Sequence, residues 1–434
     1  METLLILSIA LFAGLMLSRL AKLMQLPAVT AYLVAGILIG PYLLGNLGIK
    51  GLGFTSMSEI HTYSLLSDVA LGFIAFSIGN EFRLSTLKKT GKQATVIGIF
   101  QAVFTTLLVD ACLIGLHFLI PDKFPLPAAI MLGAIASATA PAATLMVVKQ
   151  YKAKGPLTDI LLPIVALDDA VGLVLFAVSF GIAKSIIQGS VDFISMIIEP
   201  IFEVIFSLLL GFIMGALFSF FEKFFHSRSK RLAMSVTFVL LTVALSMLEF
   251  EFFGVHVAFS SLLVCMMLGT VFCNICDFSE ELMDRIDRWT APLFILFFVI
   301  SGAELELSIF KDYIIVLIGI AYIVCRSLGK YYGARISSQA VKCEPTIQKY
   351  LGITLLPQAG VALGMAIKSQ ALGEVGIIIA NITLFGVLIY ELFGPLFTKI
   401  SLTKAGEIKP EGKVSARDKT REEMEAKKAL SEQK

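Results

Sequence analysis

The stretch LLPIVALDDAVGLVLFAVSF, residues 161–180, is almost wholly apolar, yet Asp168 and Asp169 stand side by side in its middle. A run of this length and composition is typical of a membrane-spanning helix. Each charge held at the centre of a bilayer costs about 3 kcal/mol or more. Two adjacent carboxylates at that depth therefore indicate a functional site rather than a structural contact between helices.

The whole chain has the composition of a membrane protein. It has 434 residues, of which 57% are hydrophobic and 16% charged, and its mean hydropathy is +0.87. Apolar runs of roughly 20 residues recur along it, which predicts an all-α polytopic membrane protein. The net charge of +2 gives no indication of a nucleic-acid partner. The first apolar run starts at Leu4 without a basic segment before it, so we expect no cleaved signal peptide.

Apolar runs separated by charged breaks predict thirteen transmembrane helices. The breaks after odd-numbered helices hold eighteen Lys and Arg, and those after even-numbered helices hold five. Because basic residues accumulate in cytoplasmic loops, we expect a multi-pass protein of the cell membrane with its N-terminus outside and its C-terminus in the cytoplasm. Residues 401–434 are predicted to form a charged cytoplasmic tail. The expected helices are 3–20, 28–46, 63–80, 93–120, 126–148, 157–184, 197–221, 232–249, 255–275, 289–304, 312–334, 350–370 and 375–398.

Thirteen helices suit two inverted six-helix repeats joined by the seventh helix. The fifth helix is interrupted by ASATAPAATL (136–145), which contains Pro141, and the twelfth by LPQAGVALG (356–364), which contains Pro357 and Gly360. These are matching positions in the two repeats. Interrupted helices in corresponding places indicate a transporter binding site. The alternative is a pair of packing kinks, which are common in membrane helices.

The interrupted helices supply polar groups at the depth of the two aspartates. Counted at 1.5 Å per residue from the predicted entry points, both breaks and both aspartates fall near the middle of the membrane. A proline removes a backbone donor and frees carbonyls, which attract cations. Nearby side chains add neutral oxygen ligands for a cation, and these are Ser137, Thr139, Thr144 and Gln358.

Two basic residues of CRSLGKYYGAR (325–335) are candidate partners for the buried acids. Because Asp168 and Asp169 are about 100° apart on a helix, one can face a cavity while the other faces a neighbouring helix. We expect Arg326 to pair with Asp168, and Lys330 to reach toward water near the membrane rim. Burial and a like charge nearby favour a protonated carboxyl, as a proton-coupled carrier needs.

Other polar residues in the apolar runs are weaker candidates. Entrance or interface roles are expected for Asp68, Asp110 and Glu203. Glu391 is a candidate to neutralise Lys330, while Asn80 and Glu81 are candidates to line a cytoplasmic funnel. The histidines do not cluster, and the lone CNIC pair at 273–276 has no second pair and no nearby histidine. No phosphate-binding glycine loop is present, so we predict no metal centre, no cofactor, no ATP-driven pumping and no enzymatic activity.

Several segments in their order along residues 5–400 resemble the monovalent cation:proton antiporters. The branch concerned contains the electrogenic bacterial sodium/proton antiporters and the Kef-type potassium systems. Kef-type systems carry a cytoplasmic nucleotide-binding domain and tend to have Gln in place of the first aspartate. This chain has Asp168 and no such domain, which favours sodium or lithium. The segments are LPAVTAYLVAGILIGP (26–41), ALGFIAFSIGNEF (70–82), ATAPAATL (138–145), ALDDAVGLVL (166–175), PLFILFFVISGAELEL (292–307) and CRSLGKYYGAR (325–335).

The resemblance implies a homodimer in which a core domain carries the ion site across the membrane like an elevator. Its scaffold would comprise about 1–80 and 232–304, its core about 93–184 and 312–398, with a linker helix at about 197–221. It also implies that Asp169 is the principal ion and proton carboxylate and that Asp168 pairs with a basic residue, Arg326 here. Many bacterial relatives have Lys at that position. The paired-aspartate signature is associated with electrogenic exchange.

Sequence and resemblance together predict an antiporter that exchanges protons for Na⁺ or Li⁺ by alternating access. A K⁺/H⁺ antiporter of the same fold is the first alternative. A cation channel or a non-transporting cation sensor comes from a different functional class, which the paired aspartates and interrupted helices disfavour. The expected partners are membrane lipids and a second copy of the chain, and no nucleic acid.

Overall fold

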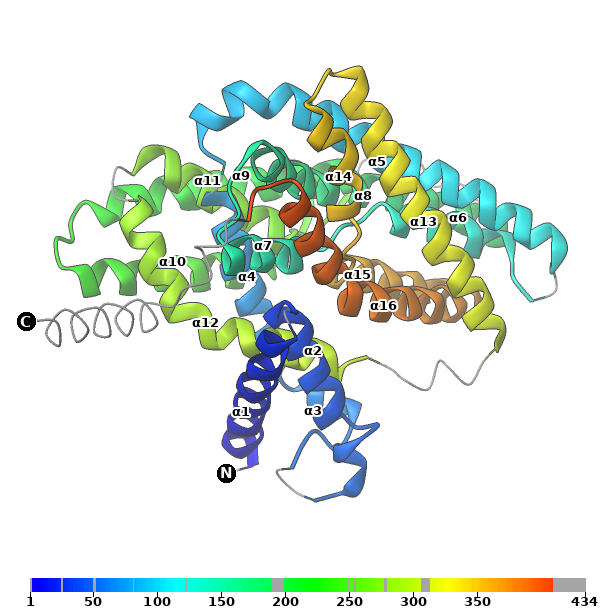
Figure 1. Ribbon diagram of the computed structural model, residues 1–434, viewed down its shortest axis with the longest axis horizontal. Coiled ribbons are helices and arrows are strands. Elements are labelled where there is room, and N and C mark those ends of the chain that lie inside the picture. Colours follow the sequence, from blue (N-terminus) through cyan, green and yellow to red (C-terminus); the bar gives the residue numbers. More distant parts are fainter. Residues whose placement is uncertain are drawn as a thin grey trace, which may run out of the picture.

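The computed structural model describes residues 2–24, 26–49, 52–80, 82–121, 123–188, 199–248, 250–252, 255–276, 279–305 and 313–408. Its regular structure is helical apart from one short hairpin of β1 (Phe250–Phe252) and β2 (Val255–Val257) (Figure 1). The helices are α1 (Glu2–Leu23), α2 (Ala28–Ile39), α3 (Met57–His61), α4 (Ser64–Asn80), α5 (Leu84–Leu119), α6 (Leu126–Ala136), α7 (Pro141–Tyr151), α8 (Pro156–Gln188), α9 (Glu199–Glu222), α10 (Arg228–Ser246), α11 (Ser261–Ile275), α12 (Ser279–Ala303), α13 (Tyr313–Ala340), α14 (Pro345–Thr354), α15 (Gly360–Ser369) and α16 (Glu374–Lys404), with 3₁₀ turns η1 (Leu44–Leu47) and η4 (Gln370–Leu372).

Each predicted transmembrane range contains a helix or an interrupted pair of helices. Among the described residues, ten helical stretches are long and apolar enough to cross a membrane, and three shorter apolar helices lie at 64–80, 261–275 and 361–372. The protein is therefore a multi-pass membrane protein. The count of thirteen crossings and the inverted repeats remain predictions.

Several predicted boundaries are wrong. Helix α5 begins at Leu84 instead of residue 93, and α12 begins at Ser279 instead of residue 289. The ninth helix was expected from residue 255, but α11 begins at Ser261 because residues 250–252 and 255–257 pair as the hairpin, whose aromatic and β-branched residues favour strands. The charged tail was expected from residue 401, but α16 continues to Lys404 and residues 405–408 pack against α7 and α8. The rest of that tail, 409–434, lies outside the described residues, as does Glu81.

The two predicted interruptions are real breaks between helices. Pro141 is the first residue of α7, and Ala140 before it has an extended backbone with φ −77° and ψ 105°. Proline disfavours helical backbone in the residue that precedes it, so α6, which ends at Ala136, cannot run on into α7. The second break separates α14 from α15, runs from residue 355 to 359 and contains Pro357.

The helices pack as two bundles. The site bundle consists of α5–α8 and α13–α16, in which α13 lies along α5 and α14 touches α8, α13 and α16. The flanking bundle consists of α1, α2, α4 and α9–α12, in which α11 packs between α4 and α9 and α12 packs on α2. In Figure 1, α13 and α6 lie at one end of the molecule and α10 and α11 at the other. The bundles meet where α7 touches α2 and α4, α16 touches α2, and α8 touches α9.

Glycines let helices of the flanking bundle approach backbone to backbone. A Cβ added at Gly79 of α4 would overlap the carbonyl of Met266 in α11, and one at Gly269 of α11 would overlap the carbonyl of Phe76 in α4. Small residues at membrane helix interfaces allow such contact.

We predict that Gly79→Ala destabilises the protein by about 1–3 kcal/mol, because the added methyl must push α4 away from α11. The measurement is thermal unfolding in detergent. Gly115→Ala in α5 is the matched control, since a Cβ there meets nothing within 4 Å. The control is expected to be neutral or slightly stabilising through its better helix propensity. Equal stability of the two variants would contradict the close α4–α11 packing.

Candidate ion-binding site

The two helix breaks lie against each other inside the site bundle. The backbone N–H of Ala140 in the first break donates to the carbonyl of Pro357 in the second at 2.8 Å. The amide nitrogen of Gln358 donates to the carbonyl of Ile135 in α6 at 3.0 Å. Residues more than 200 positions apart are thus joined where both helices are interrupted.

Arg326 of α13 holds the broken ends together. Its side chain is fully buried, and its guanidinium donates to three carbonyls, those of Ala136 at 3.0 Å, Ala138 at 2.6 Å and Leu356 at 2.7 Å. Carbonyls at helix C-termini lack partners within the helix, and the planar fork of an arginine can serve several at once. The carbonyls freed by the breaks therefore bind a cationic side chain of the protein, the guanidinium of Arg326.

The ion pair predicted between Arg326 and Asp168 is wrong, because the partner of Asp168 is Lys330. The ammonium of Lys330 lies 2.9 Å from Oδ2 of Asp168, and both side chains are fully buried. Lys330 does not reach toward the membrane rim, since α13 continues ten residues past it to Ala340. It also donates to the hydroxyl of Thr139 at 2.9 Å and to the carbonyl of Ser137.

Both carboxylate oxygens of Asp168 accept hydrogen bonds. Besides Lys330, it accepts a hydrogen bond from the hydroxyl of Thr139 at 2.7 Å on Oδ2, and one from the side-chain amide of Gln101 on Oδ1. Gln101 belongs to α5 and was not among the predicted site residues. The available signal was an isolated glutamine in the apolar run IFQAVF (99–104). A buried amide of this kind usually has a polar partner.

Asp169 differs sharply from its neighbour. Its side chain is 1% exposed, and neither carboxylate oxygen has a hydrogen-bond partner among the described residues. Helical geometry turns it away from Asp168 and onto the face of α8 that carries Leu162 and Ala166. Those two residues pack with α4 and α11 of the flanking bundle in one apolar cluster. Asp169 therefore faces the boundary between the bundles.

Hydroxyls predicted as cation ligands mostly donate to nearby carbonyls. Ser137 donates to Ala134 at 2.7 Å and Thr144 to Ala140 at 3.2 Å, so only their lone pairs remain for a cation. Gln358 exchanges hydrogen bonds with the hydroxyl of Tyr322, at 2.8 and 3.2 Å.

The remaining acids lie apart from this network. Glu391 is 5% exposed and its Oε2 has no hydrogen-bond partner among the described residues. It does not neutralise Lys330 as considered from the sequence, because Lys330 pairs with Asp168. Asp110 packs against Gly133 of α6, which agrees with an interface role. Asp68 is half-buried near the start of α4. No group of three or more metal-binding side chains occurs within the described part of the chain.

Glu407 supports the helix that carries both aspartates, although the sequence placed it in the tail. Its carboxylate accepts hydrogen bonds from the backbone N–H groups of Leu157 at 2.6 Å and Thr158 at 2.8 Å, and from the Thr158 hydroxyl at 2.6 Å. A carboxylate at a helix N-terminus satisfies orphan donors and complements the helix dipole. The segment that follows α16 thereby fixes the start of α8.

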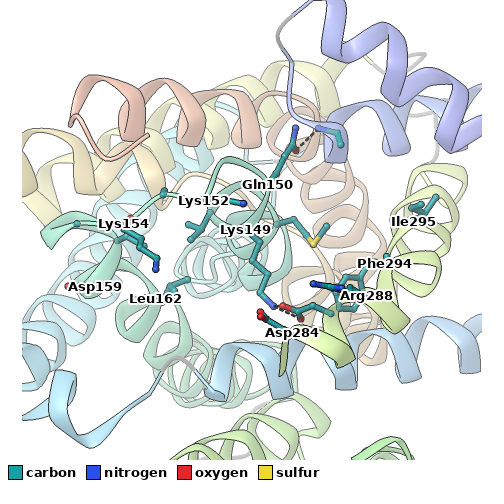
Figure 2. A pocket seen from close by; sticks show the side chains of 18 of the residues that line it. Lys149, Gln150, Lys152, Lys154, Asp159, Leu162, Asp284, Arg288, Phe294 and Ile295 are labelled. Atoms are coloured by element: carbon teal, nitrogen blue, oxygen red, sulfur yellow. Dashed lines mark hydrogen bonds and ion pairs between the residues drawn. The ribbon is translucent and has the colours of Figure 1, made fainter. Parts of the chain in front are cut away.

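A cavity of about 1000 Å³ is lined by residues of both bundles (Figure 2). Its walls come from α7, the start of α8 and the first half of α12, and Leu162 is part of them. Leu162 precedes Asp169 by seven residues, so the two lie on one face of α8 about 10 Å apart along its axis. The cavity therefore approaches the face of α8 on which Asp169 lies.

An unpartnered carboxylate beside a lysine-tied one, where two interrupted helices meet in a membrane protein, defines an ion transporter. A family model for the sodium/hydrogen exchanger transmembrane domain matches residues 7–404. The chain belongs to the sodium/hydrogen exchanger family, and it is a transmembrane antiporter rather than an enzyme.

Similar proteins span almost its whole length. The chain is 25% identical over 399 residues to the Na(+)/H(+) antiporter NhaS4 of Synechocystis sp., covering 87% of this chain and 92% of the relative. It is 24% identical over 418 residues to the K(+)/H(+) antiporter subunit KhtU of Bacillus subtilis, covering 91% and 94%. Two structures of the sodium proton antiporter MjNhaP1 from Methanocaldococcus jannaschii share its fold at 18% identity. The first has a TM-score of 0.68, and the match covers 94% of this chain and 99% of that one. The second has a TM-score of 0.71, and the match covers 93% of this chain and 98% of that one.

We predict that Asp168→Asn destabilises the protein by about 3–5 kcal/mol, because it leaves the charge of Lys330 buried and unpaired. Asp169→Asn is the matched change one residue away, and it removes no hydrogen bond. Its thermal unfolding in detergent should lie close to that of the unmodified protein. If Asp169→Asn were the more destabilised of the two, the assignment of partners would be wrong.

Proposed function

We propose that the chain exchanges protons for Na⁺ or Li⁺, and that the two compete for the carboxylate of Asp169. The observation that carries the proposal is that both Asp169 oxygens are buried without a hydrogen-bond partner. An isolated buried carboxylate is costly as an anion, so it favours a bound proton or a bound cation. Occupancy by either one neutralises the site, and occupancy by both is excluded.

Lys330, paired with Asp168, would be a second group of the site that can change its charge. Lysine can release its proton when its partner changes, whereas arginine stays charged. Lys330 as the partner therefore supports electrogenic exchange, and it removes the difficulty that an arginine in that place would raise. The hydroxyl of Thr139 and the carbonyl of Ser137 are neutral oxygens that contact Lys330 of this pair. Pro141, Pro357, Gln358 and Gly360 shape the breaks that bring these groups together.

The division into two bundles supports an elevator motion. The site bundle would act as the moving core and most of the flanking bundle as the scaffold of a homodimer. Neutralisation of Asp169 would lower the cost of carrying the site past the apolar cluster that the bundles share. The excess of Lys and Arg in alternate loops supports a cytoplasmic C-terminus in the cell membrane. The cavity would then be open toward the cytoplasm.

Exchange of K⁺ for protons is the second candidate. The Bacillus subtilis relative named as a K(+)/H(+) antiporter subunit supports it as directly as the Synechocystis relative supports sodium. Reversal potentials of proton flux in proteoliposomes, measured with Na⁺, Li⁺ and K⁺ in turn, separate the two candidates and report the stoichiometry.

We predict that Asp169→Asn abolishes sodium-dependent proton flux in proteoliposomes, because an amide cannot exchange a proton at this site. The readout is a pH-sensitive dye inside the vesicles after a sodium pulse. Asp110→Asn is the matched control, since it changes the same group at an interface position of the same bundle, and it should retain flux. Undiminished sodium-dependent flux in folded Asp169→Asn would overturn the proposal.

A further inference from the structure

An ion pair joins the two bundles across the cavity. The ammonium of Lys149, in the last turn of α7, lies 2.6 Å from Oδ1 and 2.8 Å from Oδ2 of Asp287 in α12. The two side chains are only 24% and 33% exposed. Figure 2 shows Lys149 reaching from α7 toward the wall of α12 that carries Asp284 and Arg288. Oδ1 of Asp287 also accepts a 3.4 Å hydrogen bond from Ser77 of α4, so the flanking bundle holds the carboxylate in place.

The next two residues of α7 make further contacts to the flanking bundle. The side-chain oxygen of Gln150 accepts a 2.8 Å hydrogen bond from the backbone N–H of Ala28, at the start of α2. The hydroxyl of Tyr151 donates to the carbonyl of Leu26 at 3.3 Å. The end of α7 is therefore bound to the flanking bundle by three successive side chains, and the contact of Lys149 is the charged one.

Helix α7 links this contact mechanically to the ion site. It begins at Pro141 in the first break and reaches Lys149 eight residues later, about 12 Å along its axis. A displacement of the breaks relative to the flanking bundle must carry the end of α7 with it. The contact between Lys149 and Asp287 therefore cannot persist once the site has moved by several ångströms.

We propose that Lys149 and Asp287 form a latch that keeps the ion site facing this cavity and that opens in each transport cycle. This inference rests on the proposed function, because it assumes that the bundles move past each other. Closed, the latch stabilises the cavity-facing state. Open, it exposes two charges to the water of the cavity, which limits the cost of breaking it.

A cation-collecting role for Asp287 fits the cavity less well. Its walls carry five basic residues against three acidic ones, so the surroundings disfavour accumulation of cations. The basic residues are Arg83, Lys149, Lys152, Lys154 and Arg288, and the acidic ones are Asp159, Asp284 and Asp287.

The test measures which state the protein occupies, independently of ion flux. Ala291 lines the cavity one turn beyond Asp287, so Ala291→Cys reports access from that side to a membrane-impermeant maleimide. In this background, Lys149→Gln and Asp287→Asn should each slow labelling about threefold, the effect of losing one modest ion pair. The double variant should be no slower than either single one, because the interaction is already lost. Lys154→Gln, which removes the same charge from the same cavity, should label like the parent.

A charge exchange keeps the proposal falsifiable if a single variant folds poorly. Lys149→Asp combined with Asp287→Lys should restore most of the parental labelling rate. Additive effects in the double variant, unchanged labelling in the single variants, or no recovery on exchange would each overturn the latch. Flux retained by Asp169→Asn would instead refute the proposed function. The labelling rates would still test the latch, because they do not depend on ion flux.

Discussion

The buried pair of Lys330 and Asp168 is the constraint on which the rest of the site depends. Two charges this deep in a membrane protein are tolerated only when their remaining donors and acceptors are also satisfied. Thr139, Gln101 and the carbonyl of Ser137 complete that network. It requires the first helix break to lie beside α5, α8 and α13 at one point. Asp169 is the carboxylate that the network leaves out, and under the proposed function it is the group that exchanges its occupant.

Arg326 separately stabilises the point at which the two helix breaks lie against each other. It satisfies carbonyls from both breaks, which would otherwise be unpaired in an apolar interior. The breaks are thereby stable without a transported ion, and the ion site need not be held together by its cargo. This division suits a carrier, whose site must persist when it is empty, proton-loaded or cation-loaded. It also leaves Lys330, one turn further along α13, to pair with Asp168 and to donate to Thr139 and to the Ser137 carbonyl in the first break.

Much of this arrangement could be predicted from the sequence. Hydropathy and proline positions located the helices and both breaks, and the 100° offset between adjacent helical residues separated Asp168 from Asp169. The choice between Arg326 and Lys330 could not be made that way, because residues four apart lie on the same helix face and depth counting has an error of about one turn. Gln101 and Glu407 were missed because their roles depend on tertiary contacts, with partners 67 and 250 positions away.

The central claim is that one carboxylate binds either a proton or a cation. The most direct measurement is the number of protons released when Na⁺ binds the purified protein, obtained by titration calorimetry in buffers of different ionisation enthalpy. We expect Na⁺ binding to the unmodified protein to release protons, and we expect Asp169→Asn neither to bind Na⁺ measurably nor to release protons. Sodium binding with undiminished proton release in folded Asp169→Asn would contradict this claim.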